Sequence, residues 1–437
     1  MIENLDRTTA KQIIKDLKGG TCKIENVEYI NVGNENWYRE ASQFFDDIES
    51  SKDSLVRFIK GYPGDGKTQF MGMLRSIALN KVWAISYISL LDVQLNKFDM
   101  VYSEIIKNLI LPTGIRLVDW LVLPGIRGGR ALLCAVFSSI YFKIYPPGTK
   151  EGLKKQLTLE ALKARAAEVA NHPLVDDLFG NAVRGFVDAV VNSDQGLIHR
   201  IVDWLEGDDI AIPEIGVGRK IDIRISRDAM RSISILANII GCGGILILLD
   251  ETERIIDQNR PVRKKSYHVM RNLLDNADDQ DGMRSCVIYL AATPDMFTSE
   301  RGLSEYEALR SRLHSAEILP SSGYIDWRGV IVDLTKTPLP YNLLVQLAQR
   351  IRSIHAIAQN WNPETVLTDQ SIQDIVGTIE KGVFQVSKPR MVAAGVSTLL
   401  EIVEQNPQID VSEMLPSRLG TLNNEFSKEQ KTKPWSE

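Results

Sequence analysis

Residues 58–70, FIKGYPGDGKTQF, carry side chains and glycines of the kind that bind phosphate. They match the pattern G-x-x-x-x-G-K-[ST], a glycine-rich turn that leads into a helix. Glycines allow positive φ angles, so successive backbone N–H groups can face one anion at the helix N-terminus. The lysine would lie between the β- and γ-phosphates, and the threonine hydroxyl would bind Mg²⁺. The predicted phosphate-binding residues are Gly61, Tyr62, Pro63, Gly64, Asp65, Gly66, Lys67, Thr68 and Gln69.

The flanking sequence separates a phosphate site from an ordinary glycine-rich turn. The apolar run SLVRFIK (54–60) predicts a strand before the loop. After the loop, TQFMGMLRSIALN (68–80) has apolar residues at near-helical spacing. A strand before and a helix after form the context that a phosphate-binding loop requires. A turn without a ligand remains the alternative interpretation.

Two adjacent acids end the apolar run ILILLDETE (245–253). We expect the strand next to the phosphate loop to end in an aspartate that holds the water shell of Mg²⁺. A glutamate directly after it would polarise the attacking water. Asp250 and Glu251 fit these two roles, and Thr68 with Asp250 are the predicted metal ligands. The alternative is that an acid after a buried strand only caps the strand or the next helix.

A hydroxyl ends the next predicted strand, because Thr293 follows the apolar run in YLAATPDMF (289–297). There it would orient the attacking water against the γ-phosphate. The alternative is a threonine N-cap followed by proline at the first helical position, and the two interpretations are compatible.

Three arginines are candidates for neutralising charge in the transition state. Arg310 and Arg312 share the segment EALRSRL (307–313) and would act on a neighbouring subunit's nucleotide, or else lie on an exposed helix face. Arg390, in SKPRM (387–391), stands at a helix start, where the helix dipole gives no reason for a cation. We expect it to bend back onto the nucleotide.

Two clusters of basic residues are candidates for contacts with nucleic acid phosphates. They are GRKIDIRISRDAMR (218–231) and NRPVRKKSYHVMR (259–271). Acids are interleaved with them, and the whole chain is acidic, with a net charge of −5 and a pI near 5.8. Solvated helix faces are therefore the preferred interpretation, and direct DNA contact stays open.

The elements that must position these residues alternate between strands and helices. The predicted strand regions are nearly continuously apolar, as expected for parallel strands covered on both faces. We therefore predict an α/β fold with a parallel-sheet core of the P-loop type. The strands are expected at 55–60, 81–90, 243–250 and 285–293, with a weaker fifth at 328–335, after a mostly helical segment at 1–53.

About 150 residues separate the second and third predicted strands, more than one crossover needs. Their helical periodicity predicts a helical insertion. Three helices with start signals follow residue 338, and they predict a small lid domain. The expected division is 1–110 (N-terminal segment and first half of the core), 111–215 (insertion), 216–337 (second half of the core), 338–410 (lid) and 411–437 (flexible tail).

Composition is typical of a globular protein, with 44% apolar and 24% charged residues. The four cysteines, Cys22, Cys134, Cys242 and Cys286, are far apart, which favours reduced thiols and a cytoplasmic location over a zinc site or disulfides. The segment MIENLDRTTAKQ (1–12) lacks the apolar stretch of a signal peptide, so we do not expect it to be one. The most apolar run, residues 131–142, is too short to cross a membrane, so we expect a buried helix or a docking surface.

The ordered set of phosphate loop, Asp-Glu, hydroxyl-ended strand, arginine and helical lid resembles the AAA+ ATPases, over roughly 25–110 and 235–405. INVGNENW (30–37) looks like the segment that flanks the adenine in that group. The resemblance implies nucleotide contacts for Val32 and Gly33, although Asn34 stands where those sequences usually carry arginine.

A narrower resemblance covers most of the chain. IVDWLEGDD (201–209), the acidic strand with the helix before it (229–255), LAATPDMF (290–297) and TTAKQIIKDLKGG (8–20) are similar to the ATP-binding proteins of BREX (bacteriophage exclusion) phage-defence systems. This resemblance implies an ATPase that acts with other defence proteins on foreign DNA.

We therefore expect an ATP- and Mg²⁺-dependent switch or motor that hydrolyses ATP. It would work as a homo-oligomer or in a complex with other defence proteins, without a membrane. A nucleotide-gated scaffold that recruits a nuclease or methyltransferase is one alternative. A DNA-loading ATPase is another, although we expect the roughly thirty residues after the lid to be too few for an added winged-helix domain.

Overall fold

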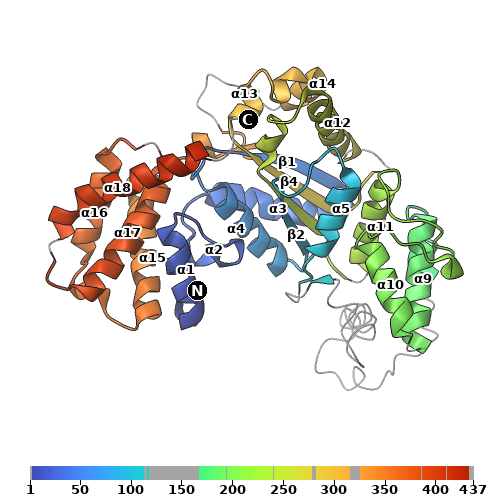
Figure 1. Cartoon of the computed structure of the whole chain (residues 1–437), viewed down its shortest axis with the longest axis horizontal. Coiled ribbons are helices and arrows are strands. Elements are labelled where there is room, and N and C mark those ends of the chain that lie inside the picture. Colours follow the sequence, from blue (N-terminus) through green and yellow to red (C-terminus); the bar gives the residue numbers. More distant parts are fainter. Residues whose placement is uncertain are drawn as a thin grey trace.

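A five-stranded parallel sheet in the order β2-β3-β4-β1-β5 forms the centre of the molecule (Figure 1). All five predicted strands are present, and the α/β prediction is confirmed. The computed structural model describes residues 2–112, 116–117, 167–192, 194–239, 241–277, 282–314, 325–384, 386–409 and 411–432. The strands are β1 (Ser54–Lys60), β2 (Ala84–Ser89), β3 (Ile245–Asp250), β4 (Cys286–Ala292) and β5 (Ile331–Asp333).

The strand order corrects one prediction. β4 pairs with β1 on one side and with β3 on the other, so the strand that ends in Asp250 does not adjoin the strand before the phosphate loop. Chain order alone does not reveal this, because the chain returns from the edge strand β2 through β3 to β4. All the strands are parallel, so their carboxyl ends still share one edge of the sheet.

Helices cover both faces of the sheet, which explains the continuous apolar runs. Along β3, Leu246 and Leu248 point to one face, where α3 (Glu35–Ser51) and α4 (Lys67–Asn80) pack. Ile247 and Leu249 point to the other face. On that second face α5 (Phe98–Lys107) contacts β2, and α12 (Arg260–Ala277) contacts β1. The same hydrophobic cluster continues into α9 (Asp177–Asn192), α10 (Gln195–Leu205), α11 (Ser226–Ile239), α13 (Asp295–Thr298) and α14 (Glu307–His314).

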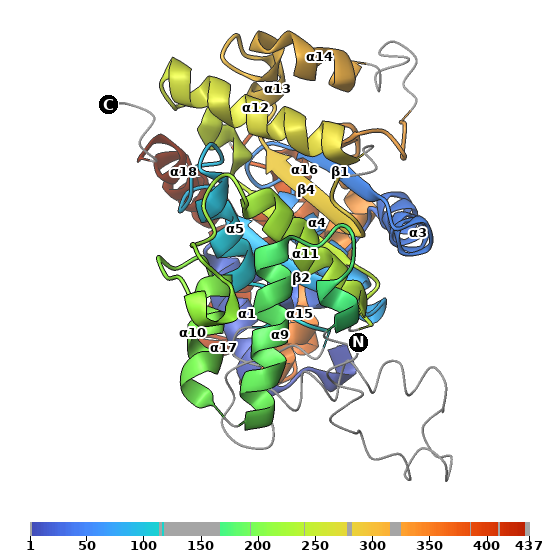
Figure 2. The same cartoon turned by 90° about the vertical axis from the view of Figure 1, so that its right-hand side faces the viewer.

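Within the predicted insertion, the structure describes helices α9 and α10. Figure 2 shows them at one end of the molecule, with α12 and α14 at the other. Residues 113–115 and 118–166 lie outside the described residues, and with them the apolar run at 131–142. Among the described residues, no helix has both the length and the apolarity that a membrane crossing needs.

A separate hydrophobic cluster lies in a helical unit at the C-terminal side (Figure 1). Its helices α15 (Tyr341–Gln359), α16 (Asp369–Lys381) and α17 (Lys388–Gln405) match the three predicted helices. The N-terminal helix α1 (Arg7–Lys18) packs against α15 and α17 as part of the same cluster. Short α2 (Val27–Ile30) connects this unit to α4.

The prediction of a flexible tail from residue 411 is wrong for residues 411–432. These residues form helix α18 (Val411–Thr432). Leu415, Leu419, Leu422 and Phe426 are buried in the C-terminal cluster. Their spacing of three to four residues gives a largely polar segment one apolar face. Single-turn 3₁₀ helices complete the fold: η1 (Ile2–Asn4), η2 (Ile24–Asn26), η3 (Pro213–Ile215), η4 (Thr252–Ile255), η5 (Leu303–Glu305), η6 (Leu334–Lys336) and η7 (Pro363–Thr365).

Candidate functional site

The glycine-rich loop joins the end of β1 to the start of α4 at the carboxyl edge of the sheet. Gly64 and Gly66 have φ angles of 91° and 93°, which side chains other than glycine rarely adopt. Gly66 is the N-cap of α4 and supplies no side chain to cap the first N–H groups. Lys67 Nζ donates to the carbonyl oxygens of Gly61 at 2.9 Å and Tyr62 at 3.4 Å. The ammonium group is therefore folded over the loop.

Two other loop side chains fix its shape. The Asp65 carboxylate accepts the Tyr62 N–H at 2.7 Å, which closes the turn. Burial raises the pKa of the Asp65 carboxyl, opposed by that hydrogen bond and by Lys67. Tyr62 is 58% exposed, so its ring stays at the surface of the loop.

Asp250 is the convergence point of the site. Asp250 lies two residues after Leu248 and four after Leu246 on β3. Alternate side chains of a strand point to the same face, so the Asp250 side chain points to the face that α4 covers. Thr68 Oγ1, on α4, donates to Asp250 Oδ2 at 3.2 Å, and the Glu251 N–H donates to Oδ1 at 2.8 Å. A third donor, the Tyr87 hydroxyl on β2, reaches Oδ2 at 2.9 Å. Burial raises the pKa of the Asp250 carboxyl, while the Glu251 and Tyr87 hydrogen bonds lower it.

The donor set at this point fits a magnesium ion. Thr68 and Asp250 offer a hydroxyl and a carboxylate, the hard oxygen ligands that Mg²⁺ prefers. Their hydrogen bond shows that two residues far apart in the chain meet beside the phosphate loop. An ion held there would also lie beside a bound phosphate chain, which normally supplies the remaining ligands.

Glu251 has an unusual backbone conformation. Its φ of 56° and ψ of 36° are left-handed, which costs a non-glycine residue on the order of 1–3 kcal/mol. Glu251 stands at the N-cap position of η4 without a side-chain capping hydrogen bond. Capping therefore does not explain this acid, and strained residues of this kind are common at functional sites.

Glu253 is a further carboxyl group at the candidate site, outside the Asp250-Glu251 pair. It is only 4% exposed, and its Oε2 has no hydrogen-bond partner among the described residues. Burial raises the pKa of Glu253 to about 7, although the positive charge of Lys67 opposes the shift. The only sequence signal was a third acid three positions after Asp250.

Thr293 follows β4, the strand between β1 and β3. Its hydroxyl oxygen is buried and lacks a hydrogen-bond partner within the described part of the chain. Helix α13 takes Pro294 as its N-cap, without a side-chain capping bond, so the structure does not support the N-cap interpretation of Thr293. A buried hydroxyl without a partner at this edge of the sheet suits a role toward a bound water or phosphate.

The segment expected to flank the adenine lies beside the phosphate-loop helix. Asn31 Oδ1 accepts hydrogen bonds from Tyr38 Oη at 3.0 Å and from Gln69 Nε2 at 3.3 Å. Val32 is buried in the C-terminal cluster. Gly33, at a φ of 74°, lies so close to α15 that a Cβ atom would be 2.9 Å from Leu343 Cδ1. The structure thus brings Gln69 together with the segment of Val32 and Gly33.

The arginine candidates occupy three different settings. Arg310 is exposed on α14, and its guanidinium makes no hydrogen bond or ion pair with the described residues. Arg312 is held by Asp275 at 2.5 Å and by the Ala308 carbonyl at 2.7 Å. These contacts do not assign Arg310 or Arg312 a role in the candidate nucleotide site of their own chain.

Arg390 lies next to the phosphate loop. A Cβ atom on Gly64 would be 2.4 Å from Ser387 Oγ and 3.4 Å from Arg390 Cβ, so the start of α17 packs against the loop. The guanidinium lies 4.2 Å from the centre of the Phe426 ring and donates to the Gly19 carbonyl at 3.5 Å. Helix α18 and the turn after α1 therefore hold this arginine.

Ion pairs account for much of the two basic clusters. In the first cluster, Lys220 and Arg231 pair with acids. In the second, Arg260 and Arg263 share Glu305, and Arg271 pairs with Asp275. These pairs favour the interpretation of solvated helix faces.

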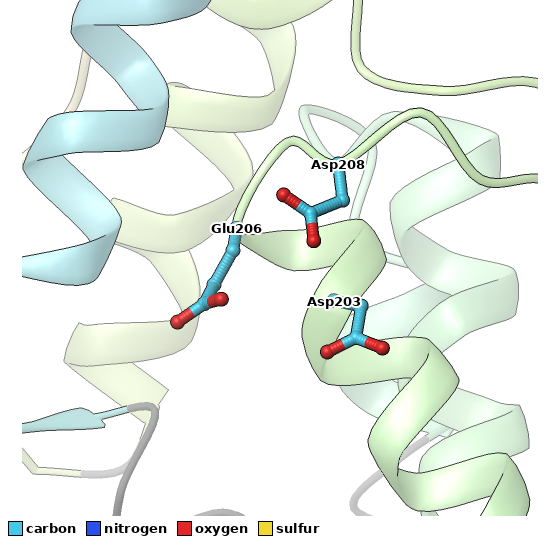
Figure 3. Close-up of side chains that lie close together, drawn as sticks. All are labelled: Asp203, Glu206 and Asp208. Atoms are coloured by element: carbon cyan, nitrogen blue, oxygen red, sulfur yellow. The ribbon is translucent and has the colours of Figure 1, made fainter.

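A separate group of acids lies at the end of α10, where Asp203, Glu206 and Asp208 come close together (Figure 3). Their ligand atoms lie within 4.8 Å of one another. Asp208 is exposed and within 4.0 Å of Lys107 Nζ, and we assign no metal to this group.

Comparison with known proteins gives a family match over most of the chain. The model of the family described as BREX system ATP-binding protein BrxC/D matches residues 5–116 and 147–418. A search of curated proteins finds no match. The family match includes the phosphate loop, Asp250, Thr293 and the helices α15 to α17. The chain therefore belongs to the family of BREX system ATP-binding proteins BrxC/D.

Proposed function

We propose that this chain is an ATP-hydrolysing switch or motor of the AAA+ type that works within a BREX phage-defence system. Membership of the BREX ATP-binding family supports ATP as the nucleotide and a role in phage defence. The single observation that carries the proposal is the hydrogen bond between Thr68 and Asp250. It joins the start of the phosphate-loop helix to the end of β3, although β4 separates β3 from β1 in the sheet.

The residues of the chain divide the work of hydrolysis among them. Loop N–H groups and Lys67 would bind the phosphates, and Thr68 with Asp250 would hold a magnesium ion, which would supply charge neutralisation. Glu251 polarises the attacking water, and the free hydroxyl of Thr293 orients it. The segment of Val32 and Gly33 would flank the base, and Gln69 holds this segment through Asn31.

Closure around the nucleotide would involve the C-terminal helices, because Ser387 and Arg390 already pack against Gly64. Arg390 would then add positive charge near the phosphates as these helices move over the loop. Arg310 is exposed and unpaired among the described residues, so it suits a neighbouring subunit's nucleotide better than its own. Turnover would therefore need an oligomer of this chain or a complex with partner defence proteins. Contact with DNA would be direct or through those partners.

A steady-state ATPase assay across a range of protein concentrations tests this proposal. We expect the rate per protomer to rise with concentration as oligomers form. Lys67→Ala is expected to lower turnover strongly by weakening phosphate binding, and Glu251→Gln to reduce it about 100-fold or more while nucleotide still binds.

A rate that is independent of concentration and insensitive to both substitutions would overturn the proposal. Tight ATP binding without turnover in the wild-type protein would instead favour a nucleotide-gated scaffold.

A further inference from the structure

Tyr87 is placed on β2 so that its hydroxyl reaches the carboxylate at the end of the neighbouring strand. β2 and β3 pair in parallel, with Tyr87 opposite Leu248 and Ser89 opposite Asp250. The Tyr87 side chain extends along this face toward the carboxyl edge and donates to Asp250 Oδ2 at 2.9 Å. The same oxygen accepts the hydroxyl of Thr68. Asp250 Oδ2 therefore accepts one hydrogen bond from helix α4 and one from the edge strand β2.

The Tyr87 hydroxyl acts as the donor in this contact, because an ordinary tyrosine hydroxyl is protonated at neutral pH and a carboxylate oxygen accepts. A donor on Oδ2 fixes the rotation of the Asp250 carboxylate plane.

Packing alone does not require this hydroxyl. Tyr289, on β4, lies in the hydrophobic cluster on the same face of the sheet, and its hydroxyl has no hydrogen-bond partner among the described residues. Both rings fill space between the sheet and the helices above it. The Tyr87 hydroxyl differs because it meets a residue proposed to hold a metal ion.

We propose that Tyr87 is a positioning residue for the magnesium-nucleotide site, acting through Asp250. This inference rests on the proposed function, because it needs Asp250 to serve Mg²⁺. Groups that hydrogen-bond to metal ligands orient those ligands, and their loss typically weakens metal affinity or activity by about 10–100-fold. Tyr87→Phe keeps the ring and removes only the donor.

The test measures nucleotide binding, by the fluorescence of a labelled ATP analogue, over a series of Mg²⁺ concentrations and in EDTA. For Tyr87→Phe we expect the Mg²⁺ concentration at half-maximal enhancement of binding to rise about 10-fold. Affinity in EDTA should stay at the wild-type value, because no contact with the phosphate loop is lost. Tyr289→Phe is the matched control and should follow the wild-type protein in both conditions.

A double-mutant cycle separates positioning from general loosening of the fold. In an Asp250→Asn background, Tyr87→Phe should have no further effect on Mg²⁺ dependence, because both changes act on one interaction. Thermal denaturation of each variant reports whether it is folded.

A Tyr87→Phe variant that follows Tyr289→Phe at every Mg²⁺ concentration would overturn this inference and leave the proposed function standing. A wild-type protein whose nucleotide binding ignores Mg²⁺ would overturn both.

Discussion

At the residue scale, Thr293 offers a way to distinguish an effect on catalysis from an effect on stability. Its hydroxyl has no partner among the described residues, so the folded state gains little from it. Replacing an unsatisfied hydroxyl with a methyl group of the same shape is nearly neutral or stabilising. A large effect of such a change on turnover would therefore report a role in catalysis.

We predict that Thr293→Val lowers ATP turnover about 10–100-fold, as expected for the loss of one oriented hydrogen-bonding group. The free energy of unfolding should change by less than about 0.5 kcal/mol or increase. Urea denaturation and a steady-state ATPase assay measure the two quantities on the same preparation. Wild-type turnover in a stable variant would remove Thr293 from the mechanism.

Local spacing predicted some residues of the candidate site and could not indicate others. The loop residues and the Asp250-Glu251 pair were identifiable because each motif is short and its chemistry is specific. Tyr87 reaches Asp250 only because β2 and β3 pair in one register. Likewise, Asn31 meets Gln69 through a contact between segments 38 residues apart. Contacts of this kind cannot be identified from the sequence until the pairing of the strands and the packing of the helices are known.

At the element scale, Gly72 lets the phosphate-loop helix approach the N-terminal segment. A Cβ atom at Gly72 would be 2.3 Å from Val27 Cγ2 and 2.7 Å from the Ile24 carbonyl oxygen. Ser76, one turn later on α4, donates to Glu28 at 2.9 Å across the same contact. Helix α4 therefore fixes the segment that leads to Val32 and Gly33.

We predict that Gly72→Ala lowers the free energy of unfolding by about 1–3 kcal/mol, because the added methyl group overpacks this contact. Gly377→Ala is the matched control on α16, where the nearest atom to a Cβ, Tyr341 Oη, is 4.0 Å away. There alanine should stabilise the protein by about 0.5–1 kcal/mol through helix propensity. Equal effects in urea denaturation would refute the packing argument.

The secondary structure was more predictable than the arrangement of its elements. Apolar runs identified all five strands, including short β5, because a covered strand has few polar residues. The order of the strands was not recoverable, since β4 enters between β1 and β3 through long-range pairing. Polar composition suggested a flexible tail, yet four apolar residues at helical spacing place α18 in the C-terminal cluster.

At the scale of the whole molecule, the candidate site lies where the sheet meets the C-terminal helices. Gly33 packs against α15, and Gly64 packs against the start of α17. The N-terminal helix α1 belongs to the C-terminal cluster, so the chain crosses between the two units before the first strand. A change in nucleotide state would thus act on both units at once, which is the behaviour that a switch requires.

Calorimetric titration with magnesium-ATP tests the central claim most directly. We predict a saturable heat of binding for the wild-type protein and at least about a 10-fold loss of affinity for Lys67→Ala, since a charge-assisted contact with phosphate contributes roughly 1.5–3 kcal/mol. The Gly377→Ala protein, altered far from the loop in sequence, should bind as the wild type does. No heat from folded wild-type protein, or equal affinity in the Lys67→Ala variant, would contradict a triphosphate site at this loop.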